Sequence, residues 1–162
     1  AWFVLSLRLM MGAAFFWAGW SKLTFVAGTP FDATGYLRFA TVANGSPVAD
    51  AFVAMSEIGW LMAVANVAVP WGELFIGLGL LVGAFVRLAA FFGAALMAMF
   101  YLGNWSVAHG VINGDFAYML VFLAVAAFGA GRILGVDRRL EQVEVGGVAL
   151  VERYPALRYV LG

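Results

Sequence analysis

The feature that most constrains the fold is an apolar run over residues 67–86, in which Glu73 is the only charged residue. Twenty such residues are enough to cross the hydrocarbon core of a bilayer, about 30 Å thick, as one helix. At 1.5 Å per residue, Glu73 would lie roughly 9 Å inside that helix. A carboxylate there costs about 2.5–3.5 kcal/mol on insertion scales, so such groups usually face the bundle interior and pair. The sequence therefore predicts a basic partner for Glu73 on a neighbouring helix.

The composition is that of a membrane protein. Of the 162 residues, 65% are hydrophobic, and the mean hydropathy is +0.98. Soluble domains are much less apolar. Because the apolar runs are continuous rather than alternating, they predict helices and not strands. We therefore expect an all-α integral membrane protein that lies in the lipid bilayer.

Four apolar runs predict a four-helix transmembrane bundle over residues 1–134. The expected spans are residues 2–26, 67–86, 88–105 and 115–133, with Arg87 at the turn between the second and third. The connection between the first two spans is too long for a structureless loop. Its pattern predicts short interfacial helices over residues 31–43 and 47–62. Residues 135–162 have a charged, mixed composition, which predicts a cytoplasmic amphipathic tail.

Lys22 is the expected partner of Glu73. In the first span a stripe of residues separated by steps of three and four ends at Lys22, and the second span repeats the same offsets from Glu73. Such residues share one helix face. If the two helices run antiparallel, Lys22 meets Glu73 and Gly19 meets Gly77, where small residues allow close packing.

A second ionic layer is expected at the opposite end of these helices, formed by Arg8, Arg87, Arg132 and Asp137. In the antiparallel arrangement Arg8 faces Arg87, which is repulsive unless an acid or a bound anion lies between them. Asp137 is the candidate acid. The remaining excess of positive charge fits lipid phosphates or an acidic partner.

The distribution of basic residues predicts the orientation. An even number of spans places both termini on one side, together with Arg8, Arg87, Arg132, Arg138 and Arg139. Lys22 and Arg38 lie on the other side. By the positive-inside rule, we expect a multi-pass protein of the plasma membrane with both termini in the cytoplasm.

The layer around Lys22 and Glu73 has two interpretations. It is either a structural buried ion pair or a proton-linked site, to which Asp115 and His109 add titratable groups. A quinone headgroup needs hydrogen-bond donors at its carbonyls and a route for protons. Candidate residues for binding it are Trp17, Lys22, Tyr36, Trp71 and Glu73.

Several classes of chemistry are excluded. The chain has no cysteine and one histidine, His109, so an iron-sulfur cluster, a cysteine zinc site and a bis-histidine haem within one copy are not expected. No metal site is predicted. The net charge is zero, which argues against a nucleic-acid partner. A redox role would depend on a diffusible cofactor or on partner subunits.

Three segments resemble the DoxX/DoxD family of four-helix membrane proteins. They are LRLMMGAAFFWAGWSKL in the first span, GELFIGLGLLVGAFVRLAA across the second and third, and GAGRILGVD after the fourth. The resemblance covers most of residues 5–137. It implies a small membrane subunit associated with oxidoreductases, such as the DoxD subunit of thiosulfate:quinone oxidoreductase. The positions that match the family's polar residues are Arg8, Lys22, Glu73, Arg87, Arg132 and Asp137.

Two functions remain open at this stage. The first is a quinone-interacting small subunit of a membrane oxidoreductase, with Lys22 and Glu73 at the headgroup and His109 or Asp115 as proton relay. The second is a non-catalytic companion that packs against a larger membrane protein or against further copies of itself, in which the charges only fix the helix register.

Overall fold

The computed structural model describes residues 1–108 and 110–162. Its body consists of four helices: α1 (Trp2–Lys22), α5 (Gly59–Val82), α6 (Val86–Asn104) and α7 (Gly114–Ala127). The first three are long and apolar enough to cross a membrane, and α7 is a shorter apolar helix. The chain is therefore an all-α membrane protein whose helices contact the lipid bilayer.

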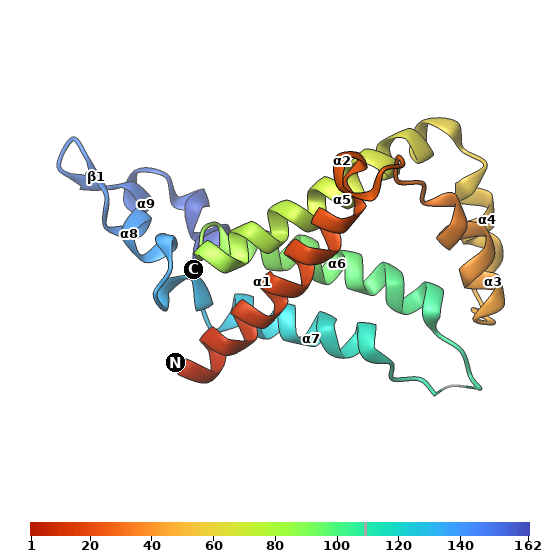
Figure 1. Cartoon of the computed structure of the whole chain (residues 1–162). Helices are drawn as coiled ribbons and strands as arrows, with labels where there is room; N and C mark the ends of the chain where they lie inside the picture. The colour runs from red at the N-terminus through yellow and green to blue at the C-terminus, as the bar shows by residue number, and fades with distance from the viewer. Residues whose placement is uncertain (109) are drawn as a thin grey trace.

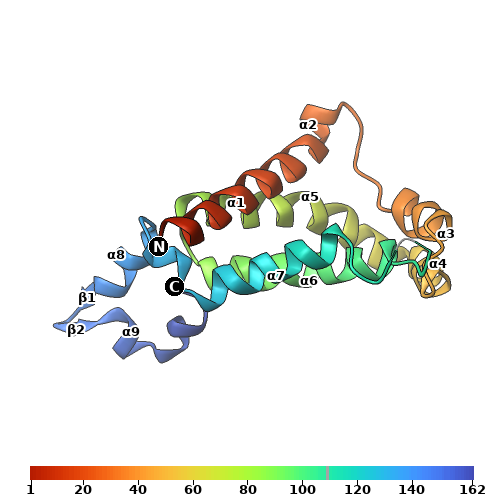
Figure 2. The same cartoon turned by 90° about the horizontal axis from the view of Figure 1, so that it is seen from below.

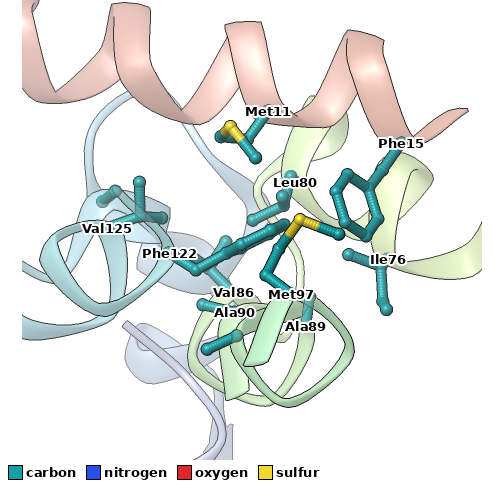
Figure 3. Packing of buried hydrophobic residues seen from close by; sticks show 12 residues of the cluster. Met11, Phe15, Ile76, Leu80, Val86, Ala89, Ala90, Met97, Phe122 and Val125 are labelled. Carbon is teal, nitrogen blue, oxygen red and sulfur yellow. The ribbon is translucent and has the colours of Figure 1, made fainter. Parts of the chain in front are cut away.

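The four helices pack in a ring, in which α1 contacts α5 and α7, and α6 contacts the same two helices (Figures 1 and 2). Their shared core contains Met11, Leu80 and Phe122, all almost fully buried. Figure 3 shows these side chains pointing toward one another between the helices. The rings of Phe15 and Phe122 meet edge to face, with centroids 4.8 Å apart, an arrangement that aromatic pairs favour.

Glycines bring α1 and α5 into close contact, but not in the predicted register. A Cβ on Gly77 would overlap the backbone of Phe16, and one on Gly19 would lie 2.6 Å from the carbonyl oxygen of Pro70. The expectation that Gly19 faces Gly77 is therefore wrong. Each glycine instead receives the backbone of the other helix, because a ridge on one helix packs into a groove on its neighbour.

The second span begins at Gly59, eight residues before the predicted start, and the predicted helix over residues 47–62 ends at Ser56, in α4 (Ala49–Ser56). Ile58 is extended and separates the two helices. Pro70 lies inside α5 without ending it. A transmembrane helix tolerates proline where a neighbouring helix packs against it, and here Gly19 of α1 does so.

The turn between α5 and α6 lies at residues 83–85, so Arg87 is the second residue of α6 and not the turn itself. Gly83 ends α5 in the left-handed conformation, with φ 71°, where glycine has no steric penalty.

The last predicted span, residues 115–133, is shorter in the structure. The α7 helix ends at Ala127, Gly129 has φ 60°, and a 3₁₀ turn, η2 (Ala130–Arg132), follows.

The segment between α1 and α5 forms a cap over one end of the bundle. The first predicted span, residues 2–26, is divided by the extended, buried Leu23 into α1 and α2 (Thr24–Ala27). The predicted helix over residues 31–43 is a π-helix, η1 (Gly35–Ala40), continued by α3 (Thr41–Ala43). The cap core consists of Ala33, Leu37, Phe52 and Met62.

The tail contains α8 (Val136–Gln142), the strands β1 (Glu144–Val145) and β2 (Val148–Ala149), α9 (Leu150–Arg153) and a 3₁₀ helix, η3 (Pro155–Tyr159). It lies at the end of the bundle opposite the cap, with both termini (Figure 2). The antiparallel strands were not predicted. Residues 160–162 do not lie on the surface but return to the bundle: Leu88 N donates to Val160 O (3.3 Å), and Leu161 is buried.

Candidate functional site

The contact predicted between Lys22 and Glu73 is present. Lys22 is the last residue of α1, and its Nζ lies 2.6 Å from Glu73 Oε2 on α5. The Glu73 side chain is 4% exposed and that of Lys22 is 29% exposed. Lys22 Nζ also donates to the carbonyl oxygen of Ala18 (3.2 Å). The pair therefore has one buried member and one member that reaches the surface of the bundle.

Lys22 opens onto a cavity of about 280 Å³ beneath the cap, which we call the cap cavity. Its two polar side chains are those of Lys22 and Tyr36, and its other lining residues are apolar. They are Phe31, Ala33, Leu37, Met55, Leu61, Ala65, Val69, Met99 and Phe100. The cavity wall is thus apolar, and the polar ends of Lys22 and Tyr36 are turned to partners outside it.

Glu73 lines a different hollow, of about 430 Å³, between α5 and α6. We call it the α5–α6 groove. Its remaining lining is apolar and includes Phe75 and Phe92, which are exposed on the outer surface of the helices. Val69 and Met99 line both the groove and the cap cavity. The two hollows are therefore neighbours, separated by these two side chains.

Tyr36 belongs to a chain of hydrogen bonds. Its hydroxyl lies 3.1 Å from Asn104 Oδ1 and 3.3 Å from the carbonyl oxygen of Phe100. Asn104 Nδ2 donates to Asp115 Oδ2 (2.7 Å), and Asn44 Nδ2 donates to Asn104 Oδ1 (2.9 Å). Burial, with a smaller contribution from the negative charge of Asp115, raises the pKa of Tyr36 to about 12. The phenol therefore keeps its proton at neutral pH.

The two predicted tryptophans do not line the cap cavity. Trp71 lines a third hollow together with Lys22 and stacks on Phe75. Trp17 is 68% exposed on α1 and lines neither the cap cavity nor the α5–α6 groove, so the expectation that it helps to form the site is not supported. His109 lies outside the described residues.

The opposite end of the bundle differs from the prediction. Arg8 is 1% exposed and donates from Nη1 to the carbonyl oxygens of Ala130 (2.6 Å) and Ile133 (2.9 Å). Asp137 is fully buried and accepts from the backbone N–H groups of Phe85 (2.7 Å) and Val86 (2.9 Å). Within the described chain Asp137 forms no ion pair with an arginine. It caps the start of α6 instead.

The remaining arginines of that predicted layer also have other partners. Arg87 donates to the carbonyl oxygens of Ala126 (3.3 Å) and Arg158 (2.6 Å). Arg132 forms a bidentate salt bridge with the carboxylate of Glu141, with N···O distances of 2.8–3.0 Å. Arg8 and Arg87 thus bind backbone carbonyl oxygens rather than the carboxylate of Asp137, whose charge nevertheless acts on Arg8.

Two contributors to the site were missed in the sequence. Asn104 joins Tyr36 to Asp115, and its signal was a polar residue at the end of an apolar helix. Asn66 accepts from the backbone N–H of Ala33 (2.9 Å) and so ties the cap to α5. In the sequence, Asn66 is likewise marked by being an amide residue within an apolar run. The apolar lining of the cap cavity had no such signal, because it depends on how the cap folds back.

The fold and the site define a small integral membrane protein with a buried charge pair beside an apolar cavity. Among the described residues no cluster of acids or histidines could hold a metal ion. A family model described as DoxX matches residues 3–105, and the chain belongs to the DoxX family. The matched range includes Lys22 and Glu73 but ends before Asp137. No curated protein and no solved structure matches the chain.

Proposed function

We propose that the protein is a quinone-interacting small subunit of a membrane oxidoreductase, and that the cap cavity receives the quinone headgroup. The observation that carries this proposal is the position of Lys22. Its ammonium group is held by a buried carboxylate, and its apolar stem lines a cavity whose second polar residue is Tyr36. Ligand sites typically combine an apolar wall with a few placed polar groups.

The size and the lining of the cavity suit one ring. The volume of the cap cavity, about 280 Å³, is slightly below the range typical of sites for drug-sized ligands. A quinone headgroup would therefore fit inside the cavity, and its isoprenoid tail would lie outside it. The α5–α6 groove adjoins the cavity, is apolar and is open along the helices. It offers a place for such a tail against the hydrocarbon of the bilayer.

A bound quinone would supply two-electron redox chemistry. To donate to its two carbonyl oxygens, Lys22 Nζ would give up its bond to Ala18 O, and the Tyr36 hydroxyl would give up its bonds to Phe100 O and Asn104 Oδ1. Glu73 fixes the position of the ammonium group. Asn104 and Asp115 would connect Tyr36 to the start of α7 as a proton route.

The proposal includes an orientation. We propose that α1, α5, α6 and α7 all span the plasma membrane, with both termini in the cytoplasm and the cap outside. The basic side chains Arg8, Arg87 and Arg132 at one end support this orientation. The α7 helix has 14 residues, about 21 Å at 1.5 Å per residue, so it would cross together with the turn that follows.

Single thiols test the orientation, because the chain contains no cysteine. Ile112→Cys, between α6 and α7, and Glu144→Cys, in the tail, are probed with a membrane-impermeant maleimide in intact cells. The expected result is labelling of Ile112→Cys alone, with Glu144→Cys reacting only after permeabilisation. Labelling of both from outside would show that α7 does not cross.

Quinone binding tests the function. The purified protein is titrated with a soluble ubiquinone or menaquinone analogue, and Lys22→Met, Glu73→Gln and Tyr36→Phe are compared with the wild-type protein. Arg38→Met and Glu57→Gln are matched controls, since Arg38 and Glu57 form an exposed pair in the cap. We expect at least tenfold weaker binding in the first three variants and unchanged binding in the controls. Equal binding in all forms would reject the site and leave the role of a companion subunit, which copurification with a larger complex would support.

A further inference from the structure

Another hollow lies at the end of the bundle opposite the cap cavity, where the tail meets α5. Its volume is about 530 Å³, and we call it the basic hollow. It is lined by Val82, Leu134, Gly135, Val136, Arg138, Arg139 and Gln142. Figures 1 and 2 show α8, which carries the two arginines, beside the end of α5.

The charge of the basic hollow is not neutralised. Within residues 1–108 and 110–162, neither Arg138 nor Arg139 forms an ion pair or a side-chain hydrogen bond. The neighbouring Arg132, by contrast, is bound by Glu141. Both free guanidinium groups are exposed, so they are available to an anion from solution or from the membrane surface.

A third arginine, Arg8, lies behind the basic hollow, where the charge of Asp137 offsets its own. The guanidinium of Arg8 lies so close to Gly135 that a Cβ there would be 3.0 Å from Arg8 Nη1. Its recorded acceptors are the carbonyl oxygens of Ala130 and Ile133, and its buried Nε has no hydrogen-bond partner among the described residues. The nearby carboxylate of Asp137 accepts from backbone N–H groups. Because the charges of Arg8 and Asp137 offset each other, the positive charge of the basic hollow comes from Arg138 and Arg139.

One wall of the hollow is apolar and exposed. Leu134 is 71% exposed and has φ 52°, a left-handed conformation that leucine rarely adopts. Val82, the last residue of α5, and Val136 are also exposed. Because α5 is long and apolar enough to cross the membrane, this wall continues the lipid-facing surface of the helix.

We propose that the basic hollow binds the headgroup of an anionic phospholipid, with the phosphate between Arg138 and Arg139 and an acyl chain along Leu134 and Val82. Charge complementarity selects the anion, because two guanidinium groups can donate several hydrogen bonds to phosphate oxygens. The apolar wall selects a lipid rather than a free anion or an acidic protein segment. This site does not depend on quinone binding at the other end.

The test uses the whole protein reconstituted in phosphatidylcholine bilayers with a trace of spin-labelled lipid. Electron paramagnetic resonance gives the association constant of phosphatidylglycerol relative to phosphatidylcholine at the protein surface. We expect the wild-type protein to prefer phosphatidylglycerol, and Arg138→Ala/Arg139→Ala to lose about fivefold of the preference for each arginine removed. Equal association of the two lipids with the wild-type protein would overturn the proposal.

A matched control separates the site from the overall charge of the tail. Arg153→Ala/Arg158→Ala removes the same charge from the same tail but from outside the hollow, and should keep the preference. An equal loss in both double variants would attribute the effect to the tail as a whole and overturn the proposal. Circular dichroism checks that both double variants retain their helix content. Added chloride should lower the preference of the wild-type protein for phosphatidylglycerol, and a preference independent of salt would contradict the role of the arginines.

Two further arms distinguish the lipid from free phosphate. Leu134→Asn keeps both arginines and tolerates a positive φ, but it removes part of the apolar wall and should weaken the preference for phosphatidylglycerol. Inorganic phosphate should displace the lipid no better than chloride at equal ionic strength. Displacement by phosphate, with no effect of Leu134→Asn, would show a free-phosphate site and reject the lipid.

Discussion

The two ends of the bundle both bury charged side chains, yet they use them differently. At the cap end, Lys22 pairs with Glu73, charge on charge, and each borders an apolar hollow. At the tail end, Arg8 and Asp137 are bound to backbone carbonyl and amide groups. Those bonds join the start of α6, the turn after α7 and the tail.

This difference shows that burial of a charge does not by itself mark a functional site. A charged side chain that binds backbone groups has a structural role. Without it, each buried amide or carbonyl would lose its hydrogen-bond partner, which would lower the free energy of unfolding. A side chain paired with another side chain beside a cavity remains able to offer a hydrogen bond to a ligand. The following substitutions test this contrast.

The largest effect on stability is expected at Asp137. Asp137→Ala removes the acceptor of the N–H groups of Phe85, Val86 and Gly162, and hydrogen bonds to charged groups contribute about 1.5–3 kcal/mol each. Because contributions within one site are not additive, we expect the free energy of unfolding to fall by less than their sum, roughly 3–5 kcal/mol, measured by dodecyl sulfate titration in mixed micelles. The control is Asp32→Ala, an exposed aspartate that accepts from Thr34 N–H, and a loss as large in that variant would contradict the contrast.

A smaller loss is expected when the pair at the cap end is broken. Lys22→Met leaves the buried carboxylate of Glu73 without its basic partner. Glu73→Leu leaves the ammonium group of Lys22 without its acidic partner. Breaking a fully buried pair costs about 3–5 kcal/mol, and because Lys22 is part-exposed we expect about 2 kcal/mol for either variant. Lys22→Met/Glu73→Leu should return close to wild-type stability while quinone binding stays lost. A double variant that still bound quinone would separate the pair from the function.

Tyr36→Phe should cost about 1 kcal/mol, the typical contribution of one hydrogen bond. It also has a pH signature. Because the pKa of Tyr36 is raised to about 12 from the ordinary 10, the folded protein holds this proton more tightly than the unfolded chain. The contribution is fully present below pH 10 and is lost as pH rises toward 12. Ultraviolet titration of tyrosinate should show one group near 12 that is missing in Tyr36→Phe, and an unchanged titration curve would contradict the assignment.

The smallest effect is expected for the exposed pair in the tail. Arg132 and Glu141 are in two-fold contact, but the side chain of Arg132 is half-exposed, and exposed ion pairs contribute about 0.2–1 kcal/mol. Glu141→Gln should therefore lower the free energy of unfolding by less than 1 kcal/mol in the same titration. A loss comparable to that of Asp137→Ala would show that the tail end depends on ion pairs after all.

The pairing of Lys22 with Glu73 could be predicted because it depends on helix periodicity alone. Two stripes with the same spacing and opposite charges at one end leave few arrangements for antiparallel helices. The register of the glycines could not be predicted in the same way. Gly77 receives the backbone of Phe16 and not a second glycine, and such a choice depends on the shapes of both helix surfaces.

The tail end was less predictable because backbone groups carry its contacts. The carbonyl oxygens that accept from Arg8 are presented by the 3₁₀ turn after α7 and the residue that follows it, and a sequence pattern of charged residues does not reveal them. The β1–β2 hairpin did have a signal: Gly146 and Gly147 both have positive φ, and paired glycines between β-prone residues favour a tight hairpin turn.

Photoaffinity labelling with an azidoquinone, followed by mass mapping of the modified peptides, tests the central claim most directly. The account predicts labels on residues that line the cap cavity, such as Tyr36, Met99 and Phe100, which unlabelled quinone prevents and Glu73→Gln abolishes. Labels confined to the lipid-facing surface, for example at Trp17, or unaffected by competition, would contradict it.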